Sequence, residues 1–206
     1  MKHALTFVAV PALAISLAAC GDNDSGDAKA PMPGHSMSAS ASPSDGGSQA
    51  QHNEQDVMFA QMMIPHHRQA IEMADLAATR AASPEVKQLA AEIKKAQDPE
   101  IKQLSAWLTT WGASVPSPGA GGMGHMEHGG MGGMMTEEEM EELKGAKGAS
   151  FDKAFLEMMI KHHEGAVAMA KTEQTSGQFP GAKKMAGDIV ASQSAEITKM
   201  RNLLKQ

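Results

Sequence analysis

The chain has 206 residues with a formal net charge of −6, and it contains 18 methionines, nine histidines and a single cysteine. This mild acidity argues against nucleic-acid binding and suits cation-rich surroundings. One cysteine excludes an internal disulfide and any site built from several thiolates, so metal chemistry would have to use Met, His and carboxylates.

Residues 1–19 have the pattern of an export signal. Lys2 precedes a short apolar run that small residues close. The run ends in Leu17-Ala18-Ala19-Cys20, which resembles the lipobox of bacterial lipoproteins, so we expect Cys20 to be lipidated. A plain signal peptide with an incidental cysteine is the alternative. The protein is then exported and, through its lipid, held on the extracytoplasmic side of a membrane, in the periplasm or at the cell surface.

Residues 20–52 are rich in Gly, Ser, Ala, Asp and Pro and have no apolar period. This composition is typical of a flexible tether. The folded domain is expected over 53–206, as a first repeat at 53–112, a Met/His-rich linker at 113–135 and a second repeat at 136–206.

Four long helices are expected, in two pairs. The first covers about 53–82 and continues through Pro65, because the second repeat has Lys161 at the corresponding position. Ser83, followed by a proline, begins the second helix, and Gly112 ends it.

In the second repeat, Thr136 opens a short acidic helix with a capping box. The third long helix starts at Ser150 or Asp152, and the fourth at Pro180. Because each amphipathic pair is too thin to bury its own apolar face, the sequence predicts an all-α fold, a four-helix bundle.

The helix pairs carry the same motif twice, at a constant offset of 96 residues, as between Phe59 and Phe155 or His66 and His162. The identical positions in the first copy are Phe59, Met62, Met63, Ile64, His66, His67, Ala70, Met73 and Ala74. A shared helical period alone would not reproduce side-chain identity this closely. We therefore infer an internal duplication of a helix–turn–helix unit.

On a helix, His66 and His162 fall in the middle of the apolar stripe, and His67 and His163 fall on its flank. Thioether sulfur favours Cu(I) and Ag(I), and imidazole adds affinity for Cu(II). Met/His ligands without cysteine therefore indicate copper. The candidate metal ligands are His66, His67, Met62, Met63, Met73, His162, His163, Met158, Met159 and Met169.

Inward-facing methionines are more often core residues than ligands, and a lone buried histidine is usually hydrogen-bonded. Four buried imidazoles are nevertheless costly unless something satisfies them. Residues of the neighbouring helices are placed to do so instead of a metal: Gln97, Glu100, Gln193 and Glu196. Because imidazole must be unprotonated to ligate, Cu(II) binding is expected to weaken below about pH 6.5.

The linker holds seven further Met and His residues, which are candidate auxiliary metal ligands: Met123, His125, Met126, His128, Met131, Met134 and Met135. A solvated linker does not normally use apolar Met, which favours this interpretation over low-complexity filler.

The doubled motif resembles the bacterial domain of unknown function 305 family. Its copies here are Phe59…Met63-Ile64-Pro65-His66-His67…Ala70…Met73-Ala74 and Phe155…Met159-Ile160-Lys161-His162-His163…Ala166…Met169-Ala170. The resemblance covers about 53–112 and 136–204. It implies a ferritin-like bundle and the role of some exported members, copper binding and copper tolerance.

We therefore expect a lipid-anchored, non-enzymatic protein that sequesters Cu(I) or Cu(II) or transfers it to a copper-handling partner. One alternative is a ferritin-like di-metal redox enzyme, but such centres typically carry Glu-x-x-His on two helices, which this sequence lacks. The other alternative is an interaction bundle without metal.

Overall fold

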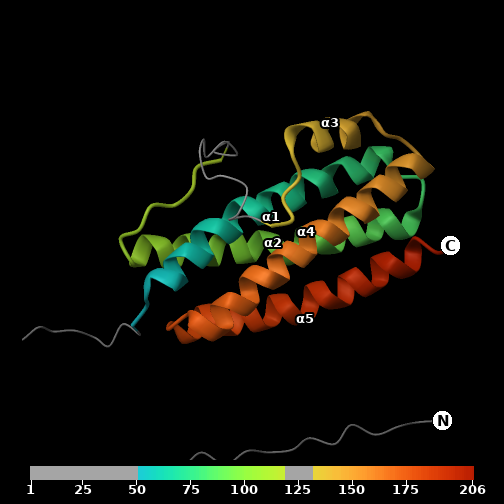
Figure 1. Cartoon of the computed structure of the whole chain (residues 1–206). Coiled ribbons are helices and arrows are strands. Elements are labelled where there is room, and N and C mark those ends of the chain that lie inside the picture. The colour runs from blue at the N-terminus through green and yellow to red at the C-terminus, as the bar shows by residue number, and fades with distance from the viewer. Residues whose placement is uncertain (1–50, 119–131) are drawn as a thin grey trace, which may run out of the picture. The chain divides into compact units, whose positions relative to one another are not determined.

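The computed structural model describes residues 51–118 and 132–206. Its helices are α1 (Glu54–Arg80), α2 (Pro84–Thr110), α3 (Glu137–Gly145), α4 (Ala149–Ser176) and α5 (Pro180–Leu203). Helix α1 packs against α2, α4 packs against α5, and the two pairs meet along α1 and α4 (Figure 1). The predicted all-α bundle is confirmed. Within the described ranges, none of the helices combines the length and apolar character that a membrane span needs.

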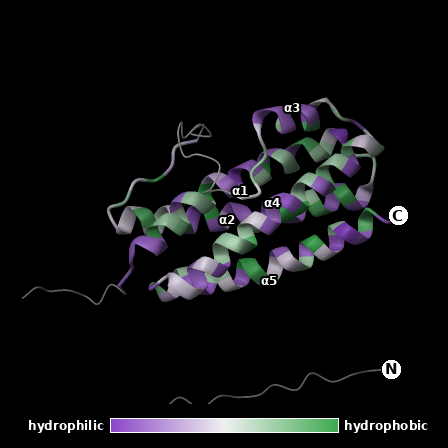
Figure 2. Ribbon diagram, in the orientation of Figure 1, coloured by the Kyte–Doolittle hydropathy of each residue, from purple (hydrophilic) through white to green (hydrophobic). Residues whose placement is uncertain are grey.

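Helices α2 and α3 begin where their capping residues predicted, whereas α4 begins at Ala149, one residue before the expected Ser150, and has no side-chain cap. Ser83 accepts hydrogen bonds from the first turn of α2, and Thr136 forms a capping box with Glu139 at the start of α3. Pro65 lies inside α1, so that helix continues through it as expected. Hydrophobic and hydrophilic residues alternate along each long helix in Figure 2, as amphipathic helices of a bundle require.

Two aspartates link the helix pairs reciprocally. Asp56, near the start of α1, accepts the Phe179 N–H at 2.9 Å, in the turn between α4 and α5. Asp152, near the start of α4, accepts the Ser83 N–H at 2.9 Å, in the turn between α1 and α2. Asp56 also accepts the N–H of Gln178, and Asp152 also accepts the N–H of Ala82. The first long helix of each pair therefore holds the turn of the other pair.

The apolar core is divided into two clusters. One contains Met73, Phe151 and Leu143, and the other contains Phe59 and Leu108. On α1 and α4 the two histidine pairs fall between the residues that belong to the two clusters. The middle of the bundle is therefore a polar layer with apolar packing on both sides.

Candidate metal centre

The polar layer draws residues from all four long helices. Its most buried members have exposed fractions of 0 to 3%: His66 and His67 on α1, Gln97 on α2, His162 and His163 on α4, and Gln193 on α5. Glu100 of α2 and Glu196 of α5 complete it, with side chains 22% and 19% exposed. These residues recur at the same 96-residue offset, His66 with His162, Gln97 with Gln193 and Glu100 with Glu196, so each helix pair supplies one matching set to the layer.

His66 and His162 face each other across the contact between α1 and α4. Their ring centroids are 3.7 Å apart, with the ring planes tilted by 42°. All four ring nitrogens are buried and lack a well-formed hydrogen bond. Unpaired buried polar atoms cost free energy, so this pair is the least satisfied polar group in the layer.

Burial keeps this pair uncharged. It lowers the pKa of His66 to about 3, with help from the neighbouring His67 and His163. Burial and the charges of the other three histidines likewise lower the pKa of His162 well below its ordinary value. A proton therefore does not compete for these nitrogens near pH 5. The expectation that Cu(II) binding weakens below pH 6.5 does not apply to this pair, because it used the unperturbed imidazole pKa, which burial lowers here.

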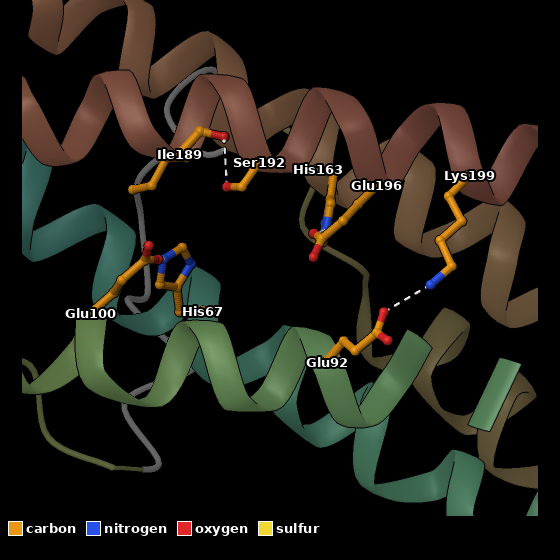
Figure 3. A network of polar contacts seen from close by, with 8 residues as sticks. All are labelled: His67, Glu92, Glu100, His163, Ile189, Ser192, Glu196 and Lys199. Carbon is orange, nitrogen blue, oxygen red and sulfur yellow. Dashed lines mark hydrogen bonds and ion pairs between the residues drawn. The ribbon is translucent and has the colours of Figure 1, made fainter. Parts of the chain in front are cut away.

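The flanking histidines are held by carboxylates from the neighbouring helices. His67 Nε2 lies 2.6 Å from Glu100 Oε2, and His163 Nε2 lies 2.7 Å from Glu196 Oε2. Figure 3 shows Glu100 of α2 beside His67 and Glu196 of α5 beside His163. The prediction that these glutamates reach the histidines is confirmed. When each carboxylate accepts the Nε2 proton, Nδ1 keeps its lone pair, and both Nδ1 atoms are buried and unpaired.

The two glutamines of the layer are buried but do not complete the network. Gln97 and Gln193 are 2% and 3% exposed, and the Oε1 atom of each has no hydrogen-bond partner. Four imidazoles and two amide oxygens thus carry unused polar atoms around one level of the bundle.

The motif methionines lie at different depths. Met63 and Met159 are fully buried, one helical turn before His67 and His163. Met73 is also fully buried, within an apolar cluster two turns beyond His66. The remaining three, Met62, Met158 and Met169, are half-buried.

Most of the linker candidates, Met123, His125, Met126, His128 and Met131, fall outside the described residues, as does Cys20. Met134 is half-buried, whereas Met135 is 5% exposed and packs into an apolar cluster. In the two described ranges, no three His, Cys, Asp or Glu side chains are already grouped to hold a metal ion. A metal site here would therefore combine an imidazole pair with thioethers.

Three further residues beside the layer escaped the sequence reasoning. The Gly132 backbone passes close to Gly165 of α4. Gln69 of α1 donates a hydrogen bond to the Met135 carbonyl. Gln69 and Gly165 occupy the same position of the two motif copies. The change from Gln69 to Gly165 between the two copies was the signal in the sequence. A helix face that otherwise repeats differs where another part of the chain packs on it.

Comparison with known proteins gives consistent matches over the domain. A DUF305 protein of Streptomyces coelicolor, considered to be secreted, superposes with a TM-score of 0.65 at 33% identity, covering 73% of this chain and 92% of that one. CopM in its Cu(II)-bound form has a TM-score of 0.62 at 39% identity, covering 73% and 95%. CopM structures in Cu(I)-bound and Ag-bound forms match at 35% identity with TM-scores of 0.60 and 0.59.

A shorter match, 38% identical over 55 residues, links the chain to uncharacterized protein L153 of Acanthamoeba polyphaga mimivirus, and it covers 27% of this chain and 36% of that protein. The model of the family described as "Domain of unknown function (DUF305)" matches residues 56–204. The chain therefore belongs to the DUF305 family.

Proposed function

We propose that this protein binds copper at the polar layer of its bundle and sequesters it or passes it on. The observation that carries the proposal is the His66–His162 pair: two uncharged, fully buried imidazoles in contact, with four unpaired ring nitrogens. A metal ion would satisfy nitrogens that the protein leaves without partners. The proposed ligands are the four motif histidines together with the motif methionines, of which Met63 and Met159 are the most deeply buried.

Copper suits this donor set better than other common metals. Imidazole and thioether donors favour Cu(I) and Ag(I), whereas Mg²⁺ and Ca²⁺ need oxygen ligands. The relatives named CopM were solved with Cu(I), Cu(II) and Ag, which supports the same cargo here. A di-iron redox centre is less well supported, because the two glutamates of the layer already contact histidines.

Binding should move the two rings apart. A metal bonded to one nitrogen of each ring at about 2 Å would keep the ring centres roughly 5 Å apart or more. The centroids of His66 and His162 are 3.7 Å apart, so α1 and α4 or the two side chains must shift on loading. Loading should therefore change the protection of backbone amides along these two helices.

The test is anaerobic titration of the full chain with Cu(I), and aerobic titration with Cu(II), each against a competing chelator. The variant carries His66→Gln and His162→Gln, which keep a polar side chain of similar length. His52→Gln is the control, because His52 is exposed and stacks on Trp111 outside the layer. The double variant should lose the tightest site, and the control should keep it. Wild-type affinity in the double variant would refute the proposed site.

We further propose that Cys20 carries the lipid and that residues 20–52 tether the domain on the extracytoplasmic side of a membrane, with the linker at 113–135 adding weaker copper sites. The lipobox-like sequence and the composition of the tether support this arrangement. Cys20→Ser should release the protein from membranes without changing copper stoichiometry. Loss of copper binding in the released form would contradict the tether.

An origin by duplication, and a ferritin-like arrangement of the four long helices, are also proposed. Equivalent residues of the two motifs meet as a pair at His66 and His162, and the paired carboxylates Glu100 and Glu196 are again 96 residues apart. Each half thus supplies one half of the layer.

A further inference from the structure

The chain that leads into α3 crosses α4 closely beside the polar layer. At Gly165 an added Cβ would collide with the Gly132 carbonyl oxygen and lie 2.5 Å from the Gly132 carbonyl carbon. At Gly133, whose φ is +89°, an added Cβ would lie 2.6 Å from the Lys161 oxygen and 2.9 Å from the His162 oxygen. Backbone meets backbone at this crossing, which only glycine on both sides allows.

The same segment is fixed to α1 by one side chain. Gln69 Nε2 donates to the Met135 carbonyl at 2.8 Å, and the Met135 N–H donates to Gln69 Oε1 at 2.7 Å. The Gln69 side-chain amide thus forms two reciprocal hydrogen bonds with the Met135 backbone. Met135 itself is 5% exposed and packs into an apolar cluster. Residues 132–135, called the crossing segment below, are therefore held to both α1 and α4.

The crossing segment lies at the level of the imidazole pair. Gln69 is one turn after His66 on α1, and Gly165 is one turn after His162 on α4. The Gly132 backbone lies near enough to the His66 ring to favour its charged form and so raise its pKa, although burial outweighs this effect. The segment thus spans from α1 to α4 where His66 and His162 meet.

We propose that the crossing segment is a fixed cover that limits access to the His66–His162 pair from the α1/α4 side, with Gly165 as its seat and Gln69 as its anchor. Gln69 and Gly165 occupy the same position in the two copies of the motif. The amide of Gln69 hydrogen-bonds the crossing segment, and Gly165 has no side chain, so the segment can pass close to α4. The role of the cover in metal loading rests on the copper site proposed above, whereas its effect on solvent access does not.

The first experiment measures access without metal. Deuterium exchange at the imidazole C2–H, read by mass spectrometry on the metal-free full chain, reports how freely water reaches each histidine. Gln69→Ala removes both hydrogen bonds to Met135 and adds no atoms, and Gly165→Ala blocks the seat. In both variants exchange at His66 and His162 should accelerate by about tenfold or more.

Two matched controls accompany these variants. Gln61 lies on α1, as Gln69 does, and its Nε2 donates to the Ser114 carbonyl at 3.0 Å. Gln61→Ala therefore releases a different loop. Gly145→Ala adds a Cβ in open space. Both controls should keep wild-type exchange at His66 and His162. Helical content measured by circular dichroism should be unchanged in Gln69→Ala, which keeps the test valid if Gly165→Ala folds poorly.

Amide exchange at Met135 decides how the result is interpreted. If the Met135 amide loses protection in Gln69→Ala while the two imidazoles exchange at the wild-type rate, the segment is not a cover. If the Met135 amide stays protected in both variants, Gln69 and Gly165 do not hold it. Either outcome overturns the proposal.

A second experiment connects the cover to metal loading. Stopped-flow loading with Ag(I) should be faster in Gln69→Ala than in Gln61→Ala, at equal stoichiometry. An equal rate would show that the segment does not limit metal entry. If Ag(I) binds elsewhere, the titration of the His66/His162 variant reveals that failure separately, while the C2–H exchange still decides whether the cover exists.

Discussion

Asp56 and Glu173 form a buried carboxyl pair where the start of α1 meets the end of α4, and neither side chain is exposed. Burial raises the pKa of Glu173 to about 8, and the hydrogen bond and charge of Asp56 add to the rise. Burial also opposes ionisation of Asp56, but hydrogen bonds from Glu173 and from backbone N–H groups outweigh it and lower its pKa. Near neutral pH the pair therefore shares one proton, held on Glu173 and donated to Asp56.

The metal-free protein should be most stable near pH 6.5. Below this pH the unfolded chain protonates His66 and His162, whose folded pKa values are lowered, to about 3 for His66, so stability falls with decreasing pH. Glu173 acts in the opposite direction. Its contribution is fully present below its ordinary pKa of 4.5 and is lost as pH rises to about 8. Each group changes the free energy of unfolding by at most about 1.4 kcal/mol per pH unit.

Below pH 6.5 the loss of stability caused by His66 and His162 exceeds the gain from Glu173. Above pH 6.5 Glu173 alone changes the stability. Urea unfolding in the presence of a chelator, at intervals from pH 4.5 to 9, measures this profile. A stability that rises steadily up to pH 8 would contradict the assignment of Glu173 as a neutral group.

Glu173→Gln should remove the decline on the alkaline side. Glutamine keeps the shape and can still donate to Asp56, but it does not ionise, so stability between pH 6.5 and 8 should become nearly flat. Glu157→Gln on the same helix is the control, because Glu157 is exposed and its ion pair with Lys153 is 3.9 Å long. The control should keep the wild-type slope.

Local signals in the sequence anticipated the elements and the centre of the layer. The Ser83 and Thr136 caps began helices as predicted, and His66 and His162 lie on the inner face that their spacing indicated. Glu100 reached a histidine as expected, because the 3.6-residue period fixes which residues of one helix share a face.

Other features depend on how the two helix pairs cross, which the period of a single helix does not specify. The reciprocal contacts of Asp56 and Asp152 need the turn of the other pair. The low pKa of His66 needs burial by helices distant in sequence. Gly165 was not singled out in the sequence, because its role depends on the backbone that crosses it.

Asp152→Ala should destabilise the fold by about 1–3 kcal/mol, because it leaves the Ala82 and Ser83 N–H groups without their partners at 3.0 and 2.9 Å. Asp152→Asn should cost less, since its amide oxygen can still accept one of the two bonds. Chemical denaturation measures both. Equal stability of the alanine variant and the wild type would mean that water satisfies this turn equally well.

Met63→Leu combined with Met159→Leu should separate the two copper oxidation states. Leucine conserves volume, so each change should cost less than about 1.5 kcal/mol of stability. It removes a thioether, a donor that favours Cu(I), so Cu(I) affinity should fall more than Cu(II) affinity. Met200→Leu is the control, because Met200 is fully buried in α5 outside the motif. If both variants bind Cu(I) equally, these sulfurs are core atoms.

Glu100 and Glu196 should act as positioning residues for the copper site. Each carboxylate contacts a histidine Nε2, at 2.6 and 2.7 Å, and so presents the unpaired Nδ1 to the interior. Loss of such a carboxylate typically lowers metal affinity about 10–100-fold. Glu100→Gln with Glu196→Gln should therefore weaken Cu(II) binding within that range and alter the nitrogen hyperfine pattern in electron paramagnetic resonance, because the amide no longer enforces one tautomer.

The matched control for this pair is Glu92→Gln. Glu92 lies on α2 two turns before Glu100 and pairs with Lys199 of α5 at 2.8 Å, so it bridges the same two helices without contacting a histidine (Figure 3). Its loss removes an exposed ion pair that contributes about 1 kcal/mol or less. Cu(II) affinity and spectrum should stay at wild-type values in Glu92→Gln. If the Glu100/Glu196 variant matches this control in both measurements, His67 and His163 do not ligate copper through Nδ1, and the site is confined to His66, His162 and their thioether neighbours.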